Sequence, residues 1–67
     1  MDLRYATGMV VIVTVADATV RGRLAAVNRK WLVVTDAVSL ATGHDPVPIA
    51  GRLFVPIGQL IYVQVVE

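Results

Sequence analysis

The chain has no cysteine and a single histidine, His44. It can therefore form no disulfide and no thiolate metal site, and one histidine cannot build a zinc site of several imidazoles within one chain. A chain of 67 residues buries only about 60% of its unfolded surface, so domains of this size usually need a disulfide, a metal or a partner subunit. Since the composition leaves only the partner subunit, we expect self-assembly.

Charged residues are also scarce, at 16% of the chain against 57% hydrophobic residues. One small domain cannot hide so much apolar surface, and the excess indicates subunit interfaces. Long apolar runs are missing, since Met9–Val13 ends at Thr14, far short of the ~20 residues of a membrane-spanning helix. The first residues do not resemble a signal peptide. We expect a cytoplasmic protein with no membrane partner.

The apolar residues are dominated by valine, and β-branched residues favour strands. The alternation and the turn signals predict strands over Met9–Val15, Thr19–Val27, Trp31–Leu40, Arg52–Val55 and Leu60–Val66. Residues Ala41–Ala50 are predicted to form a loop, because Pro46 and Pro48 cannot donate a hydrogen bond to a strand ladder. Residues Met1–Thr7 can supply at most one helical turn.

The second predicted strand alternates clearly between two faces. One face is expected to carry Val20, Leu24 and Ala26, and the other Arg21, Arg23 and Ala25. A glycine inside such a strand, here Gly22, marks a bend or a close approach of the backbone. We therefore predict one all-β domain over residues 1–67: a small, strongly bent, five-stranded antiparallel barrel of the SH3 type. Its two edge strands would be satisfied by head-to-tail pairing around a ring.

Two segments resemble the two sequence motifs of the Sm and Sm-like family. In the first, Gly22-Arg23-Leu24 is followed by Asn28 and by the apolar strand from Trp31, where the family has glycine, any residue, leucine and then Asp or Asn. The second covers residues 51–63: a glycine, a short apolar strand, a turn and a final apolar strand. The resemblance implies a homo-oligomeric ring of about six or seven subunits, in which strand four pairs with strand five of the next subunit. It also implies that the turns Asn28–Lys30 and Pro56–Gln59 line a pore that holds single-stranded RNA.

The chain departs from the family at the positions that read RNA. The family's base-reading asparagine falls on Leu32, and its stacking aromatic falls on Lys30, although Trp31 is adjacent. The arginine of the second motif falls on Pro56 and the glycine after it on Ile57. The resemblance therefore implies ring assembly more strongly than it implies RNA binding.

The candidate RNA-binding residues are Asn28, Arg29, Lys30, Trp31, Pro56, Ile57, Gly58 and Gln59. An aromatic ring beside cations can stack on a base and attract its phosphate. The alternative is that Asn28–Lys30 is an ordinary polar turn and that Trp31, which leads an apolar strand, lies in the core. Ile57 is either an apolar rim of the pore or a packed turn residue.

The other polar residues form no recognisable catalytic or metal-binding motif. Arg21 and Arg23, with Arg52 expected nearby, could follow phosphates, or could keep the barrel soluble by pairing with Asp17, Asp36 or Glu67. His44 and Asp45 sit on a proline-rich loop with no nucleophile placed beside them, so we expect no catalytic residue, no cofactor and no enzyme activity. Three functions stay open: a ring that binds single-stranded RNA, a ring that serves as a scaffold or binds a protein partner, and a monomeric SH3-like or OB-like adaptor.

Overall fold

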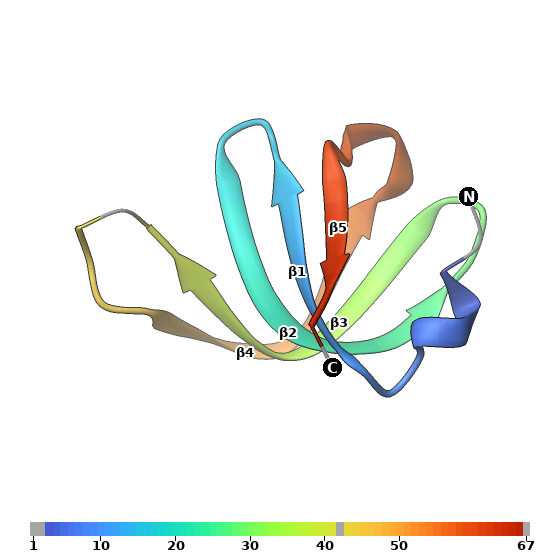
Figure 1. Cartoon of the computed structure of the whole chain (residues 1–67), viewed down its shortest axis with the longest axis horizontal. Coiled ribbons are helices and arrows are strands. Elements are labelled where there is room, and N and C mark those ends of the chain that lie inside the picture. Colours follow the sequence, from blue (N-terminus) through green and yellow to red (C-terminus); the bar gives the residue numbers. More distant parts are fainter. Residues whose placement is uncertain (1–2, 42, 67) are drawn as a thin grey trace.

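The computed structural model describes residues 3–41 and 43–66, so that residues 1, 2, 42 and 67 lie outside the described part of the chain. The elements in chain order are the 3₁₀ turn η1 (Arg4–Ala6), the strands β1 (Val10–Val15), β2 (Ala18–Val27), β3 (Trp31–Leu40) and β4 (Val47–Pro56), the 3₁₀ turn η2 (Ile57–Gln59) and the strand β5 (Tyr62–Val65). They form one sheet in the order β4-β3-β2-β1-β5 (Figure 1).

The five strands are all antiparallel, as predicted, but the sheet does not close into a barrel. After η2 the chain crosses to β1, where β5 pairs over only four residues, from Tyr62 to Val65. β4 and β5 thus lie at opposite ends of the strand order, and neither has a second partner strand within residues 3–41 and 43–66. The predicted all-β sheet of five antiparallel strands with two edge strands is therefore confirmed, whereas its description as a barrel is wrong, because β4 and β5 do not meet.

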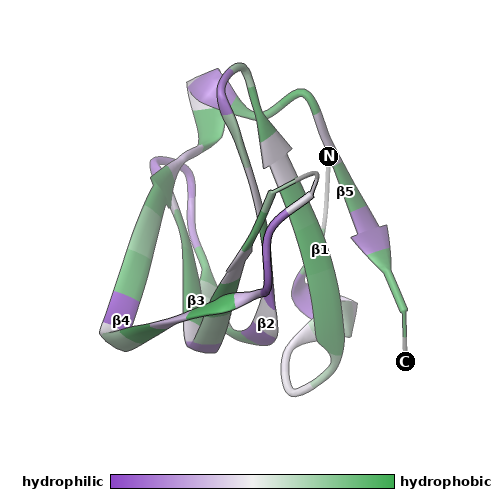
Figure 2. Ribbon diagram, turned by 90° about the vertical axis from the view of Figure 1, so that its left-hand side faces the viewer, coloured by the Kyte–Doolittle hydropathy of each residue, from purple (hydrophilic) through white to green (hydrophobic). Residues whose placement is uncertain are grey.

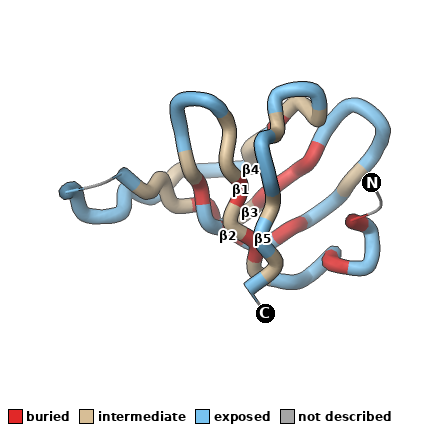
Figure 3. The backbone as a smooth tube through the Cα atoms, turned by 45° about the horizontal axis from the view of Figure 1, so that its top comes forward, coloured by how far each residue is buried: buried red, intermediate tan, exposed pale blue. Residues whose placement is uncertain are grey.

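The core lies on the concave face of the bent sheet. The fully buried side chains of greatest volume are Val11, Leu24, Leu32 and Val34, which come from β1, β2 and β3. Figure 3 shows buried segments on these strands and exposed segments at the turns, and Figure 2 shows that β1 is apolar along most of its length. Valines and leucines in the central strands therefore account for most of the buried surface.

Gly22 lies where β2 and β3 approach each other closely, as the sequence predicted. A Cβ atom there would lie 2.4 Å from Val34 Cγ1 and 2.9 Å from the carbonyl oxygen of Thr35. Only glycine lets β2 and β3 approach this closely without displacing the core.

Three irregularities bend the sheet and change the predicted alternation. The register between β2 and β3 shifts between Arg21 and Arg23 and again between Leu24 and Ala26. Ala26 is exposed after the second shift, so the prediction that it shares a face with Leu24 is wrong. The register between β3 and β4 shifts after Thr35, where Asp36 has a φ of 52° and Gly51 a φ of 79°. An extra residue in one strand increases the local twist, and this produces the strong curvature.

The largest error in the predicted strands concerns β4. It begins at Val47 rather than Arg52, so that residues 47–50 of the predicted loop belong to the ladder, with Pro48 opposite Val38. An edge strand tolerates proline, because one side of its backbone has no ladder partner. β5 is shorter than predicted, whereas β3 has the predicted bounds.

At the other end of the chain, η1 is the single helical turn that the sequence allowed within Met1–Thr7, and Met1 and Asp2 lie outside the described residues. Leu3 and Ala6 are buried against the core. Through these two side chains, η1 and the residue before it pack against the core.

Candidate nucleic-acid interface

The turn between β2 and β3 is built by the side chain of Asn28. Its Oδ1 atom accepts hydrogen bonds from the backbone N–H groups of Lys30 and Trp31, each at 2.8 Å. The backbone N–H of Asn28 also donates to the carbonyl oxygen of Trp31 at 3.0 Å. Asparagine favours such turns because its side chain satisfies donors two and three residues later. Oδ1 of Asn28 thus shapes the turn and presents Arg29 and Lys30 to solvent.

The second predicted turn lies directly against the first. Pro56 at the end of β4 pairs with Trp31, and the N–H of Ile57 donates to the carbonyl oxygen of Lys30 at 2.9 Å. A further hydrogen bond from the N–H of Leu60 to the carbonyl oxygen of Ile57, at 3.2 Å, closes η2. The structure therefore brings all eight candidate residues together at one end of the sheet, although the two groups that they form, 28–31 and 56–59, lie more than twenty positions apart in the sequence.

Trp31 lies on the outer face of the sheet and is 38% exposed. It is not part of the core cluster, whose neighbouring members in β3 are Leu32 and Val34. The placement of Trp31 in the core, one of the two alternatives from the sequence, is therefore wrong. Its ring meets the ring of Phe54 edge to face, with centroids 6.0 Å apart and planes at 85°.

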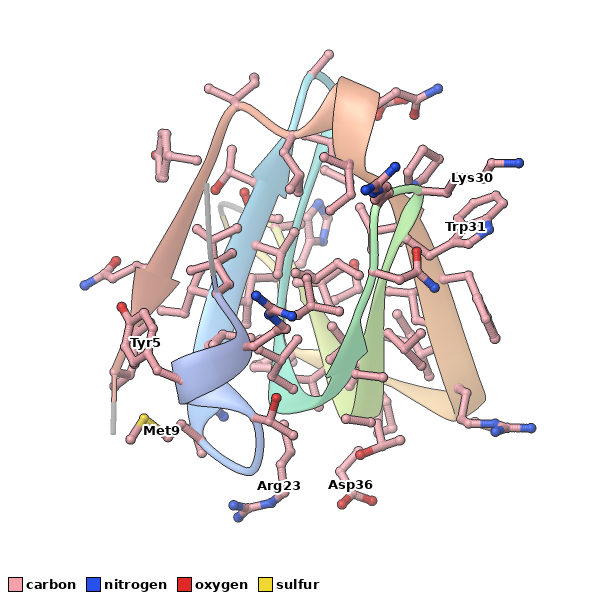
Figure 4. The ribbon with its side chains drawn as sticks, turned by 90° about the vertical axis from the view of Figure 1, so that its right-hand side faces the viewer. Tyr5, Met9, Arg23, Lys30, Trp31 and Asp36 are labelled. Atoms are coloured by element: carbon pink, nitrogen blue, oxygen red, sulfur yellow. The ribbon has the colours of Figure 1, made fainter. Side chains whose placement is uncertain are left out.

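Two cations lie beside this aromatic pair. Arg29 and Lys30 are exposed, and neither forms an ion pair with a carboxylate of the described residues. Figure 4 shows the side chains of Lys30 and Trp31 extending away from the sheet on the same side. An exposed aromatic ring with neighbouring unpaired cations is the arrangement that binds a base together with its phosphate.

The remaining residues of the second turn divide into packed and exposed groups. Ile57 is half-buried and packs against the core cluster, which supports its interpretation as a packed turn residue rather than a free apolar rim. Gly58 and Gln59 are exposed. Gln59 is thus the member of this turn with a polar side chain available to a ligand.

Sequence reasoning missed Phe54, which lies on β4 next to the candidate site. The alternation could have revealed it, because Leu53 and Val55 point toward the core and the residue between them must then point outward. Phe54 is 51% exposed and meets the exposed Trp31, so the two rings form an apolar pair open to solvent.

Arg52 was expected near Arg21 and Arg23. The structure pairs Arg52 with Thr35, whose partner on the other side of β3 is Arg23.

Arg21 and Arg23 lie at a different place, in a hollow of about 410 Å³ that also contains Asp36. Arg23 donates a hydrogen bond from Nη1 to the carbonyl oxygen of Gly8. Neither arginine forms an ion pair with Asp17 or Asp36, and Glu67, the third predicted partner, lies outside the described residues. Figure 4 places Arg23 and Asp36 at the end of the sheet opposite Lys30 and Trp31, so this hollow is separate from the two turns.

A catalytic or metal site of another kind would need His44 or a cluster of acidic side chains. His44 is exposed on the loop before β4, and its N–H donates to the carbonyl oxygen of Ala41 at 3.1 Å. In the described ranges, no three acidic or histidine side chains gather closely enough to hold a metal ion. Those ranges also contain no helix with the length and hydropathy of a membrane span.

Comparison with known proteins finds no family model that matches the chain and no match among curated proteins. The interpretation of the site therefore depends on its own geometry and on the sequence resemblance described above.

Proposed function

We propose that the chain assembles through its two sheet edges into a closed homo-oligomeric ring of the Sm-like type, and that the two joined turns bind single-stranded RNA. The observation that carries the assembly is that β4 and β5 lie at opposite ends of one sheet and each leaves one edge of its backbone unpaired within the described residues. Unpaired strand edges readily pair with another chain. Two different edges on one subunit give a head-to-tail contact, which repeats until a ring closes.

Exposed apolar side chains accompany both edges. Val47 on β4 is 58% exposed, and Ile61 and Tyr62 at the start of β5 are each 59% exposed. Large exposed apolar groups gathered at an edge mark an interaction surface. Pairing β4 of one subunit with β5 of the next would remove part of this surface from water while satisfying both backbones. A ring of about six or seven subunits is the size that the Sm-like resemblance implies.

RNA binding is supported by the contact between the two turns. The hydrogen bond from the N–H of Ile57 to the carbonyl oxygen of Lys30 fixes both turns as one unit, beside which Trp31 is exposed. A ring repeats this unit once per subunit, so contacts that are weak singly act together on one strand. We assign stacking to Trp31, phosphate attraction to Lys30 with help from Arg29, and polar contacts to Asn28 and Gln59.

A second candidate function is a ring that binds a protein partner and no RNA. It is favoured by an apolar groove of about 320 Å³ between the β1–β2 hairpin and β4, lined by side chains such as Val15, Ile49 and Leu53. The near-neutral net charge of +1 also favours it. Under this alternative the ring forms, but the two turns hold no oligonucleotide.

Native mass spectrometry of protein purified without nuclease tests the assembly and the ligand together. We expect a discrete multiple of 7.2 kDa, with additional mass that ribonuclease removes. A ring without additional mass would support the second candidate function. A monomer at micromolar concentration would contradict the ring and would favour the monomeric adaptor.

A pair of edge variants tests whether the contact is head to tail. Val47→Lys with Ala50→Lys places charges along β4, and Tyr62→Lys with Gln64→Lys does the same on β5; all four side chains are exposed. Each variant alone is expected to be monomeric, and an equimolar mixture is expected to give dimers only, through the one intact edge of each. Rings from either variant alone would show that the strand edges do not make the contact.

A further inference from the structure

A row of side chains runs along the outer face of β3 and β4, starting at the joined turns. Phe54 lies opposite Val33, and Arg52 lies opposite Thr35, on the face away from the core. Together with Lys30 and Trp31 these two β4 residues form what we call the outer strip: Lys30, Trp31, Phe54 and Arg52. The outer strip begins inside the candidate RNA site and leads away from it along β4.

The two aromatic rings of the outer strip are open to a ligand. Trp31 and Phe54 are 38% and 51% exposed and stand perpendicular to each other, at 85°. A flat base placed in the corner between them stacks on one ring and turns its edge toward the other. Both arrangements are favourable for aromatic groups. The rings also cover Val33, which is only 7% exposed, so their structural role must be separated from any binding role.

Positive side chains lie at both ends of the outer strip. Lys30 is at one end, next to Arg29, and Arg52 is at the other. The one carboxylate of β3, Asp36, follows Thr35, the ladder partner of Arg52. Arg52 is exposed and forms no ion pair within the described residues, so its guanidinium group is available to another anion. Cations on either side of two exposed rings favour an anionic partner that carries planar groups.

We propose that single-stranded nucleic acid continues from the joined turns onto the outer strip, with a second base stacked on Phe54 and edge-on to Trp31, and a phosphate on Arg52. This rests on the proposed RNA binding and extends it by a second nucleotide position. Residues two apart in a strand are separated by about 6.6 Å, so Arg52 can reach the phosphate of a nucleotide whose base contacts Phe54. Pairing of the β4 edge in a ring uses backbone groups, and the outer face of the strand stays open.

The tryptophan of the chain reports on this site directly, because there is only one. Titration with an oligouridylate of about 12 nucleotides, inside the usual range of site sizes, is expected to quench Trp31 fluorescence. Phe54→Leu keeps an apolar cover over Val33 but removes the ring. We expect it to weaken binding roughly 5- to 100-fold, the loss that follows removal of one base stack. Phe54→Tyr, which keeps a ring, is expected to bind within a few-fold of the original protein.

The phosphate contact has its own measurement. Arg52→Gln is expected to lower the slope of log affinity against log salt by about 0.7, the value for one lost phosphate contact on a single strand. Arg52→Lys is expected to keep the slope. Arg21→Gln is the matched control, because it removes the same charge from an exposed arginine outside the outer strip. Native mass spectrometry of every variant confirms that assembly is unchanged.

The outcomes separate this inference from the proposed function. If Phe54→Leu binds like the original protein, the rings only cover Val33 and the outer strip is not a binding site, whereas RNA binding at the turns stands. If Arg21→Gln lowers the salt slope as much as Arg52→Gln, the effect of Arg52 is general attraction and the phosphate assignment is wrong. If the original protein itself neither binds the oligouridylate nor changes its fluorescence, both the proposed RNA binding and this extension are wrong.

Discussion

The three central strands and the two edge strands of this sheet are stabilised in different ways. The largest fully buried side chains, Val11, Leu24, Leu32 and Val34, all belong to β1, β2 and β3. Among the ten residues of β4 only Val55 is buried, and none of the four residues of β5 is. The centre is therefore stabilised by buried side chains, while the edges depend on ladder hydrogen bonds on one side and offer free backbone groups on the other.

The difference teaches that the ability to fold and the ability to assemble belong to separate parts of this chain. Changes in the centre should alter the free energy of unfolding, and changes of exposed edge side chains should alter mainly the oligomeric state. The stability measurements below use the β5-edge variant, Tyr62→Lys with Gln64→Lys, so that subunit contacts do not add to the measured stability, whereas oligouridylate binding is measured without the edge substitutions.

The largest effect is expected from Leu24→Ala. Leu24 is fully buried, so truncation leaves a cavity in the core and should lower the free energy of unfolding by about 2–5 kcal/mol. Urea denaturation followed by circular dichroism measures it. Val47→Ala at the edge, where the side chain is 58% exposed, is the comparison and should change stability by less than about 0.5 kcal/mol. If Leu24→Ala and Val47→Ala lower the free energy of unfolding equally, the proposed distinction between the centre and the edge of the sheet is wrong.

An intermediate effect is expected from Gly22→Ala. The added methyl group would lie 2.4 Å from Val34 Cγ1 and 2.9 Å from the carbonyl oxygen of Thr35, so β2 and β3 must move apart at a cost of about 1–3 kcal/mol. Gly58→Ala is the matched control, because a Cβ atom there meets nothing within 4 Å. Thermal unfolding of both variants gives the comparison, and an unchanged melting temperature for Gly22→Ala would show that the strands can separate freely.

The smallest effect is expected at the turn, from Asn28→Ala. This change removes the acceptor of two backbone hydrogen bonds and should cost about 1 kcal/mol. Asn28→Asp keeps an acceptor oxygen and should restore most of the stability. If Asn28 also contacts RNA through its amide N–H₂ group, Asn28→Asp will be stable but will bind oligouridylate more weakly. If the original protein and Asn28→Asp bind oligouridylate with equal affinity, Asn28 has a purely structural role.

The sequence was sufficient to predict the centre of the fold and insufficient at its edges. Alternating valines defined β1, and β3 has the predicted bounds, because burial on one face imposes a period of two. The start of β4 was missed, since Pro48 and Gly51 interrupt a ladder in most contexts and are tolerated here by an edge strand with a bulge. Ala26 was assigned to the wrong face because a bulge shifts the alternation, and a bulge has no clear sequence signal.

The candidate site shows the same division between local and long-range information. The turn at Asn28 follows from local side-chain chemistry and was predicted from the residues themselves. The contact between the two turns joins residues far apart in the chain, and only the family resemblance indicated it. The Trp31–Phe54 pair depends on the register of β3 against β4, which no local pattern specifies, so Phe54 was not among the predicted residues.

The unequal lengths of the two edges have a consequence for the proposed ring. β4 has ten residues and β5 has four, so more than half of the β4 edge would find no opposite strand even after assembly. Pro48 and the kink at Gly51 lie in the half of β4 that begins at Val47. A proline and a kink are features by which natural sheets discourage further strands from adding to an edge. Wherever β5 of the next subunit pairs along β4, the proline and the kink limit the ability of the remaining β4 edge to accept a further strand, so that finished rings are less prone to associate with one another.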